Sequence, residues 1–202
     1  MKTITIAFIA ASFALPASAE QRHSFDVAED LSRFVFAPEP AHEDGSPAYG
    51  TPFITRGYLS PAGTLDGGVE GTLADGSPAF PDQVIGVWTC DGYLVGDGMK
   101  TLSGDIVVTR QIYQFDDGGI LISQGTELAD IGVPVTRAIT GGTGDYADAG
   151  PALTQVLLGM SDGYGVRLQV DLGAEARQAL LEGPRSPVPV AFRPDPFEVD
   201  AN

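Results

Sequence analysis

The sequence has little of what most enzymatic and nucleic-acid-binding sites are built from. Its 202 residues include one cysteine, two histidines and 11 lysines and arginines, against 27 aspartates and glutamates. The single cysteine, Cys90, excludes an internal disulfide, so the stability of the domain must come from packing. The net charge of −16 repels nucleic acid and anionic lipid, and no basic stripe is present to bind either.

The positions of the two histidines leave few catalytic options. His23 and His42 both precede the main strand-like part of the chain, so a Ser-His or Cys-His triad inside the fold is not expected. Zinc binding is equally disfavoured, and the Asp-Gly turns lack the regular ligand spacing of an EF-hand calcium site. We expect neither a metal nor a cofactor. A hydrolase adapted to high salt would suit the acidity, but it would need a base other than histidine.

A secretory signal peptide is predicted over residues 1–19. Lys2 supplies the positive start, residues 4–15 form a short apolar run, and the small residues 17–19 suit a signal peptidase. The run is too short to span a bilayer, and no stop-transfer segment follows it. We therefore expect a secreted or periplasmic chain that begins near Glu20, without a membrane span. A buried N-terminal strand or helix is the alternative.

The remaining chain divides into three parts by composition. Residues 20–50 are acidic and punctuated by prolines, which is typical of a flexible arm. Residues 51–173 alternate between β-branched or aromatic runs and turns of Gly, Asp and Pro, which predicts a β-domain. Residues 174–182 have a helical pattern that Gly183 and Pro184 end, and an irregular proline-rich tail follows to residue 202.

The connections between the strand-like runs predict the fold class. Most are short turns such as Asp116–Gly119, and crossover helices are missing, so we expect antiparallel strands. A sandwich and a closed barrel both satisfy this pattern. We favour an all-β closed antiparallel barrel of about eight strands, because closure removes exposed edges. Seven clear runs lie at residues 52–60, 84–96, 104–115, 120–128, 133–140, 152–160 and 166–172, and an eighth is available at 32–36.

A glycine cluster at residues 138–150, AITGGTGDYADAG, needs its own interpretation. Residues 142–147 fit the dinucleotide-binding pattern G-x-G-x-x-[GA], which requires a helix directly after the glycines. Here Gly150 and Pro151 follow almost at once, and Asp145 and Asp148 would repel phosphate. We interpret the cluster as a tight turn that joins two antiparallel strands.

This turn also carries a resemblance to a known family. The motif GGTGDY, preceded by PVTRAIT and followed by TQVLLG, resembles the turn shared by plant allene oxide cyclases, dirigent proteins and their bacterial barrel relatives. The resemblance covers roughly residues 52–172, although residues 149–151 read Ala-Gly-Pro where the family usually has Ala-Arg-Gly. It implies a calycin-like, eight-stranded barrel of the allene oxide cyclase type with a central cavity, often assembled as a trimer.

A barrel of this size holds one small ligand, which a few polar side chains orient. Glu127 shares a strand face with Ser123 and Gly125, and facing inward it would be an acid or base within the cavity. The alternative is a strand-end carboxylate that is solvated or paired with Arg110 or Arg137.

Six further side chains complete the candidate site. We assign catalytic roles to Tyr113 and Tyr58 beside Glu127, with the tyrosines as donors to a ligand oxygen. Ligand-binding roles are assigned to Arg56, Trp88, Cys90 and Arg110. The alternatives are core or interface packing for the tyrosines and an inert buried thiol for Cys90.

Two functions from different classes remain. The first is an exported barrel that binds a small apolar molecule; if it is an enzyme, it is a cofactor-free cyclase or isomerase that holds a flexible substrate in a reactive shape. The second is a non-enzymatic structural or interaction barrel that assembles through its outer face and its proline-rich tail. The sequence leaves open which applies and whether the barrel is a homo-oligomer.

Overall fold

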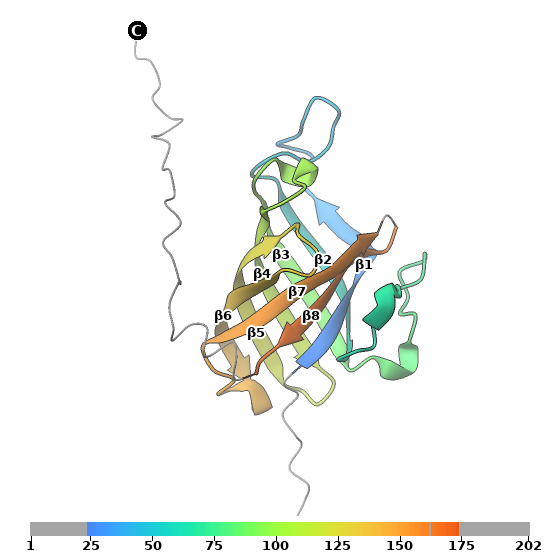
Figure 1. Cartoon of the computed structure of the whole chain (residues 1–202), viewed down its shortest axis with the longest axis vertical. Coiled ribbons are helices and arrows are strands. Elements are labelled where there is room, and N and C mark those ends of the chain that lie inside the picture. The colour runs from blue at the N-terminus through green and yellow to red at the C-terminus, as the bar shows by residue number, and fades with distance from the viewer. Residues whose placement is uncertain (1–23, 162, 174–202) are drawn as a thin grey trace, which may run out of the picture.

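The computed structural model describes residues 24–161 and 163–173. Its strands form one closed antiparallel barrel, in which consecutive strands pair and β8 pairs with β1 (Figure 1). This confirms the all-β closed barrel and excludes the sandwich. The eight strands are β1 (Ser24–Phe36), β2 (Pro52–Pro61), β3 (Gly86–Leu94), β4 (Asp105–Phe115), β5 (Ile120–Leu128), β6 (Pro134–Thr143), β7 (Ala152–Ser161) and β8 (Gly165–Asp171).

Several predictions concern the ends of the chain. The signal peptide at residues 1–19 and the helix and tail at residues 174–202 lie outside the described residues. Within residues 24–161 and 163–173, no helix has the length and apolar character needed to cross a membrane.

Strand β1 corrects the predicted domain boundary. The sequence predicts an arm over residues 20–50 and an eighth strand at 32–36, but β1 already begins at Ser24. Its acidic residues are buried: Asp26 accepts a hydrogen bond from the Leu65 amide at 2.9 Å, and Asp30 accepts hydrogen bonds from Ser32. The acidic composition misled the prediction, because nearby amide and hydroxyl groups donate hydrogen bonds to these carboxylates inside the fold.

The long loop between β2 and β3 covers the outer face of β1. It contains the 3-10 turns η1 (Asp66–Gly68) and η2 (Pro81–Gln83) and lies beside β1 at the right of Figure 1. Glu70 fastens the loop, because its carboxylate pairs with Arg167 of β8 and accepts a hydrogen bond from Ser161 of β7 at 2.7 Å. The loop explains why the first half of β1 is buried on both faces.

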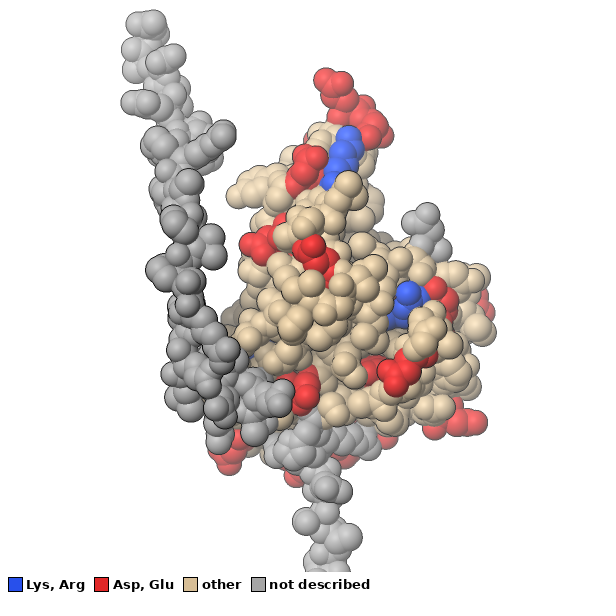
Figure 2. Space-filling model, viewed as in Figure 1, with Lys and Arg blue, Asp and Glu red and all other residues tan. Residues whose placement is uncertain are grey.

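The outer surface carries an excess of negative charge. Figure 2 shows acidic side chains spread over one face of the barrel, with few cationic side chains between them. Two of the surface cations have acidic partners: Lys100 lies 2.9 Å from Asp44, and Arg110 lies 2.8 Å from Asp91. The face shown therefore has no basic patch.

The glycine cluster joins two antiparallel strands, as predicted. Gly141 and Gly142 lie near the end of β6, and one 3-10 turn, η4 (Gly144–Tyr146), follows before β7. Tyr146 is buried and stacks on Phe115 with the ring centroids 4.4 Å apart. Three residues of 3-10 turn do not form a nucleotide-binding helix, so the dinucleotide interpretation is excluded.

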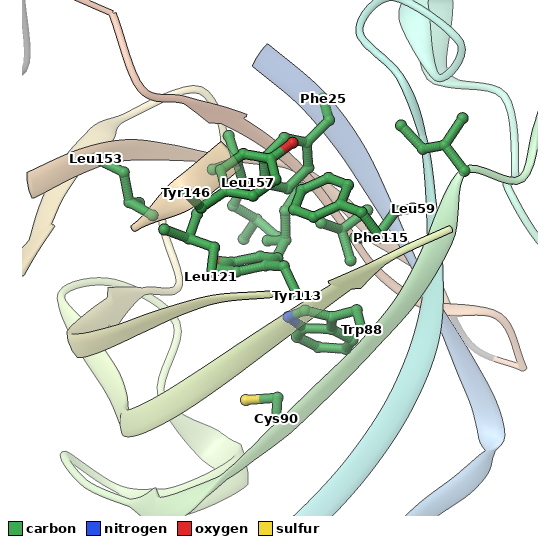
Figure 3. Close-up of a cluster of buried hydrophobic side chains, with 14 of the residues drawn as sticks. Phe25, Leu59, Trp88, Cys90, Tyr113, Phe115, Leu121, Tyr146, Leu153 and Leu157 are labelled. Atoms are coloured by element: carbon green, nitrogen blue, oxygen red, sulfur yellow. The ribbon is translucent and has the colours of Figure 1, made fainter. Parts of the chain in front are cut away.

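The barrel interior is solid at one end. We call this the closed end; there β4 joins β5, β6 joins β7, and the chain ends of β1 and β8 lie together. Phe25 packs edge-on against Tyr113 and Phe115, with centroid distances of 5.1 and 5.2 Å. The opposite end, where β3 joins β4 and β5 joins β6, is the open end. The closed end is filled by Phe25, Leu59, Trp88, Tyr113, Phe115, Leu121, Tyr146 and Leu153 (Figure 3).

Two neighbouring glycines at the closed end provide a test of this packing. A Cβ at Gly142 would lie 2.0 Å from the Tyr146 carbonyl oxygen, whereas a Cβ at Gly141 would first meet Ile122 Cδ1 at 3.8 Å. We expect Gly142→Ala to lower the free energy of unfolding by about 1–3 kcal/mol, because backbone must shift to admit the methyl group. Gly141→Ala should stay within about 0.5 kcal/mol of the parent. Urea unfolding followed by Trp88 fluorescence measures both, and equal losses would contradict the packing described.

Candidate functional site

A cavity of about 360 Å³ occupies the open end of the barrel. Phe34 and Phe53 stack on each other in its wall, with ring centroids 5.3 Å apart. Phe36, Met99, Val133 and Met160 line the cavity and are each 43–47% exposed, so they form its mouth. Most of the remaining wall is aliphatic and includes Leu94, Val107, Leu128, Val135, Leu157 and Leu168.

The alternation of side chains along each strand places several polar side chains on the inner face of the barrel, beside this cavity. On β3, Trp88, Cys90 and Leu94 are buried on one face, and all three line the cavity. On β5, Ser123 and Glu127 are buried on the face that points inward. Successive side chains of a strand point to opposite faces, so one inward residue fixes the others on its strand.

A layer of buried polar side chains separates the solid closed end from the cavity. Glu127 is its centre: Oε1 accepts hydrogen bonds from the Thr109 hydroxyl at 2.5 Å and the Gln111 amide at 2.8 Å. Its other oxygen, Oε2, accepts from the Gln155 amide at 2.8 Å. Two of these donors lie on β4 and the third lies on β7, so the carboxylate on β5 links three strands of the barrel. We call this the polar layer, and it consists of Thr109, Gln111, Ser123, Glu127, Arg137 and Gln155.

Arg137 is the cation of the polar layer. Its side chain is fully buried, and Nη1 lies 3.5 Å from Glu127 Oε1. The guanidinium also donates to the Ser123 hydroxyl at 3.2 Å, to the Thr109 hydroxyl at 2.8 Å and to three backbone carbonyls. The pairing of Glu127 with Arg137 therefore holds inside the barrel, whereas Arg110 lies outside with Asp91.

Gln111 connects two aromatic residues to the carboxylate. Its Oε1 accepts hydrogen bonds from Trp88 Nε1 at 3.3 Å and from the Tyr113 hydroxyl, while its Nε2 donates to Glu127. Burial raises the pKa of Tyr113 well above its ordinary value, so its hydroxyl stays protonated and donates. Tyr113 thus connects to Glu127 through Gln111, from the closed-end side of the polar layer, and its hydroxyl also lies 3.4 Å from Ser123 Oγ.

Cys90 faces the cavity as a neutral thiol. Its Sγ lies 3.9 Å from Glu127 Oε1. Burial, and next the nearby Glu127 charge, raise the pKa of Cys90 well above its usual range, although Arg137 opposes the shift. A thiol in this state is not a nucleophile, so Cys90 contributes surface and a weak hydrogen-bond donor.

Glu29 is a second buried carboxylate on the cavity wall. It is 3% exposed, and its Oε2 accepts a hydrogen bond from the Val166 amide at 2.8 Å. Burial raises the pKa of Glu29, and the charges of Glu127 and Asp30 add to the rise, while the Thr55 hydroxyl and the Val166 amide oppose it. The pKa of this cavity-facing group is therefore shifted toward neutral pH, which suits an acid or base.

The structure separates the predicted site residues into two groups. Glu127, Trp88 and Cys90 line the cavity, and Tyr113 lies beneath it. Arg56 and Arg110 are exposed on the outer face of their strands, where Arg110 pairs with Asp91. Tyr58 also lies on the outer face and donates to the Gly76 carbonyl at 3.1 Å. These three residues do not reach the cavity, because strand parity turns them away from it.

Several site residues were missed by sequence reasoning. Glu29 lies in the segment that reads as an acidic arm, although Phe25, Val27 and Glu29 have the strand spacing of one face. Gln155 has such a signal too: it is the polar residue between Leu153 and Leu157 on the buried face of β7. A polar residue at an inward position of an otherwise apolar face is therefore the signal that marks this site.

The site resembles a binding cup more than a metal centre. In the described ranges, no group of three or more histidine, cysteine, aspartate or glutamate side chains is placed to hold a metal ion. The arrangement can enclose an apolar molecule, orient its polar end at Glu29 and Glu127, and exchange a proton with it.

Comparisons with known proteins add the fold family. The pterocarpan synthase dirigent protein GePTS1 is 15% identical with a TM-score of 0.51, over 73% of this chain and 84% of that one. Its counterpart PsPTS1 is also 15% identical, with a TM-score of 0.50, over 73% and 89%. A pyocyanin demethylase is 17% identical with a TM-score of 0.47, over 73% and 96%. No protein-family model and no curated protein matches the sequence. At this level of identity the dirigent proteins show the fold alone, a dirigent-like barrel.

Two glutamates with opposite pKa shifts generate a prediction on stability. Glu29 has a raised pKa in the folded state, so its ionisation opposes folding above that pKa, and the penalty disappears as the pH falls toward the ordinary value of 4.5. We expect Glu29→Gln to be most favourable relative to the parent at neutral pH, with the difference shrinking on acidification. Urea unfolding at several pH values measures it.

Glu70→Gln is the matched comparison. Burial opposes ionisation of Glu70, but hydrogen bonds from Arg167 and Ser161 outweigh it and hold the pKa below 4.5. Its ionised form therefore stabilises the fold above about pH 4.5, and this contribution is lost as the pH falls through the lowered pKa. We expect Glu70→Gln to be destabilising at neutral pH and nearly neutral in acid. If the stability of both variants relative to the parent changed with pH in the same direction, the environments described for Glu29 and Glu70 would be wrong.

Proposed function

We propose that this protein is an exported small-molecule-binding barrel that encloses an apolar ligand in the cavity at its open end. The observation that carries the proposal is the cavity of about 360 Å³, whose wall is mostly apolar and whose floor is the polar layer. Ligand sites combine an apolar wall with a few placed polar groups in this way.

A finer proposal is that the barrel is a cofactor-free isomerase or cyclase. The resemblance to the allene oxide cyclase and dirigent families supports it, together with two carboxylates on the cavity wall. The enclosed wall would hold a flexible substrate in a reactive shape. One carboxyl group would remove a proton from the substrate or give one to it, and the proton would return before release, so the mass of the molecule stays unchanged.

Binding is tested with the uncharged dye N-phenyl-1-naphthylamine, whose fluorescence rises in apolar surroundings. We expect the parent to bind it and Val135→Trp to weaken binding by about tenfold or more, because the indole occupies part of the cavity. The matched control is Ile54→Trp, on the exposed outer face of β2. Equal affinity in all three proteins would rule out the cavity as the site.

A further variant, Glu127→Gln, tests the finer proposal. Molecules extracted from the purified protein are incubated with parent and Glu127→Gln, then separated by liquid chromatography with mass detection. A reaction of the proposed class gives a product of equal mass and new retention time with the parent alone.

A second candidate function is supported by the outer face. Ile54, Tyr93 and Val108 lie on β2, β3 and β4, are 46–59% exposed, and include the cross-strand pair Tyr93–Val108. An apolar patch of this kind is typical of an interaction surface, here for assembly of the barrel with copies of itself.

Assembly through this patch is tested by light scattering. We expect Tyr93→Lys to shift the protein toward the monomer, because a charge would be buried in the contact. Arg56→Lys, on the same face but outside the patch, should leave the mass unchanged. A parent that is monomeric at high concentration would remove this candidate.

A further inference from the structure

The lining of the cavity has two carboxylates and no cationic side chain. Glu29 and Glu127 line it, whereas no lysine, arginine or histidine of the described part of the chain does. Glu127 is already matched by Arg137 at 3.5 Å, beneath the cavity. Within residues 24–161 and 163–173, no ion pair involves Glu29. The uncompensated charge that faces the cavity therefore belongs to Glu29.

One more oxygen on the cavity wall lacks a partner, and another keeps room to accept a hydrogen bond. Gln155 Oε1 is buried and accepts no hydrogen bond from another described residue, whereas the buried Thr55 hydroxyl is directed to Glu29 and its oxygen can still accept one. The side chains of Thr55 and Gln155 are only 1% and 2% exposed. Since nearly all buried polar atoms in folded proteins have a partner, the Gln155 oxygen indicates a polar group that the ligand brings.

The orientation of the Gln155 amide is fixed by its neighbour. Its Nε2 donates to Glu127 Oε2 at 2.8 Å, and the reversed amide would place two acceptors against each other. Oε1 therefore remains an acceptor without a donor. Glu29 accepts from the Val166 amide at Oε2 and interacts with the Thr55 hydroxyl, and an ionised carboxylate still has acceptor capacity for a further donor.

These groups select the chemistry of the ligand head. A carboxylate or phosphate would face the charge of Glu29 with the same sign, which is costly in an enclosed site. An alcohol brings one donor and no charge. A protonated primary amine brings a positive charge and three N–H donors without an acceptor, so it can satisfy several acceptor oxygens at once.

We propose that the ligand is a cationic amphiphile, with a protonated amine against Glu29, Thr55 and Gln155 and an apolar body along the wall toward the mouth. The inference rests on the proposed binding function and adds the class of ligand. The body would contact Phe34 and Phe53, which stack beside the cavity. The acidic surface in Figure 2 also attracts cations from solution, which favours their approach to the barrel.

Three probes of equal chain length test the proposal. Octylamine, octan-1-ol and octanoate are titrated against the complex of the full chain with N-phenyl-1-naphthylamine at neutral pH and low salt. We expect octylamine to displace the dye at a concentration at least about tenfold lower than octan-1-ol, since a charge-assisted hydrogen bond is stronger than a neutral one. Octanoate should be the weakest competitor.

Variants assign the preference to the cavity. Glu29→Gln should weaken octylamine by about tenfold and leave octan-1-ol unchanged, and Thr55→Val should weaken octylamine more mildly. The control is Asp91→Asn, which removes the same unit of charge from the outer face of β3 and should change neither probe. If Glu29→Gln does not fold, Thr55→Val against the same control decides the matter.

The outcomes separate this inference from the proposed function. If the dye does not bind the parent, the binding function fails and the inference falls with it. If the dye binds but octan-1-ol or octanoate competes as well as octylamine, the barrel remains a binder and the cationic ligand is refuted. An octylamine preference that persists in Glu29→Gln and Thr55→Val, or that is lost in Asp91→Asn, also overturns it, because the preference would then come from the surface.

Discussion

The pairing of Glu127 with Arg137 is the interaction on which the rest of the interior depends. Both charges are buried within a barrel, where an unpaired charge is strongly unfavourable. Their remaining hydrogen-bonding capacity is met by Thr109, Ser123 and Gln155, from three different strands. The pair therefore fixes the relative positions of these strands and holds a polar layer across the barrel. Below that layer the interior can pack as an ordinary core, and above it a space can remain open.

The sequence was sufficient for the architecture but only partly for the site. Runs with strand-like alternation and short turns predicted the barrel, and the glycine cluster was correctly assigned to a connection. Strand β1 was shortened because Asp26 and Asp30 look solvated in a linear sequence, whereas a distant loop and local hydroxyls bury them. Glu29 was lost with that segment. On β4, polar and apolar residues occur on both faces, so the sequence could not show that Gln111 points inward and Arg110 outward.

The comparison with known structures establishes the fold, whereas the function is inferred from the side chains of the cavity. The similarity to dirigent proteins, at 15% identity, shows a shared barrel and nothing about the reaction. The proposals on function rest instead on which side chains this chain places in its own cavity. An apolar wall selects a hydrophobic molecule, while the acceptor oxygens and the unpaired carboxylate select its head group. The two kinds of surface line one cavity, so they constrain a single molecule together.

The filled closed end has a consequence for the size of what the barrel accepts. Trp88, Tyr113, Phe115 and Tyr146 are buried and pack together at that end, while the exposed lining of the cavity lies at the other end. A guest whose head is anchored at the floor must extend its body toward the mouth. A short guest leaves empty volume behind it, and a long one projects between Phe36 and Met160 into water. The affinity of the barrel for a series of homologous compounds would then depend on their length, because the depth of the cavity is fixed.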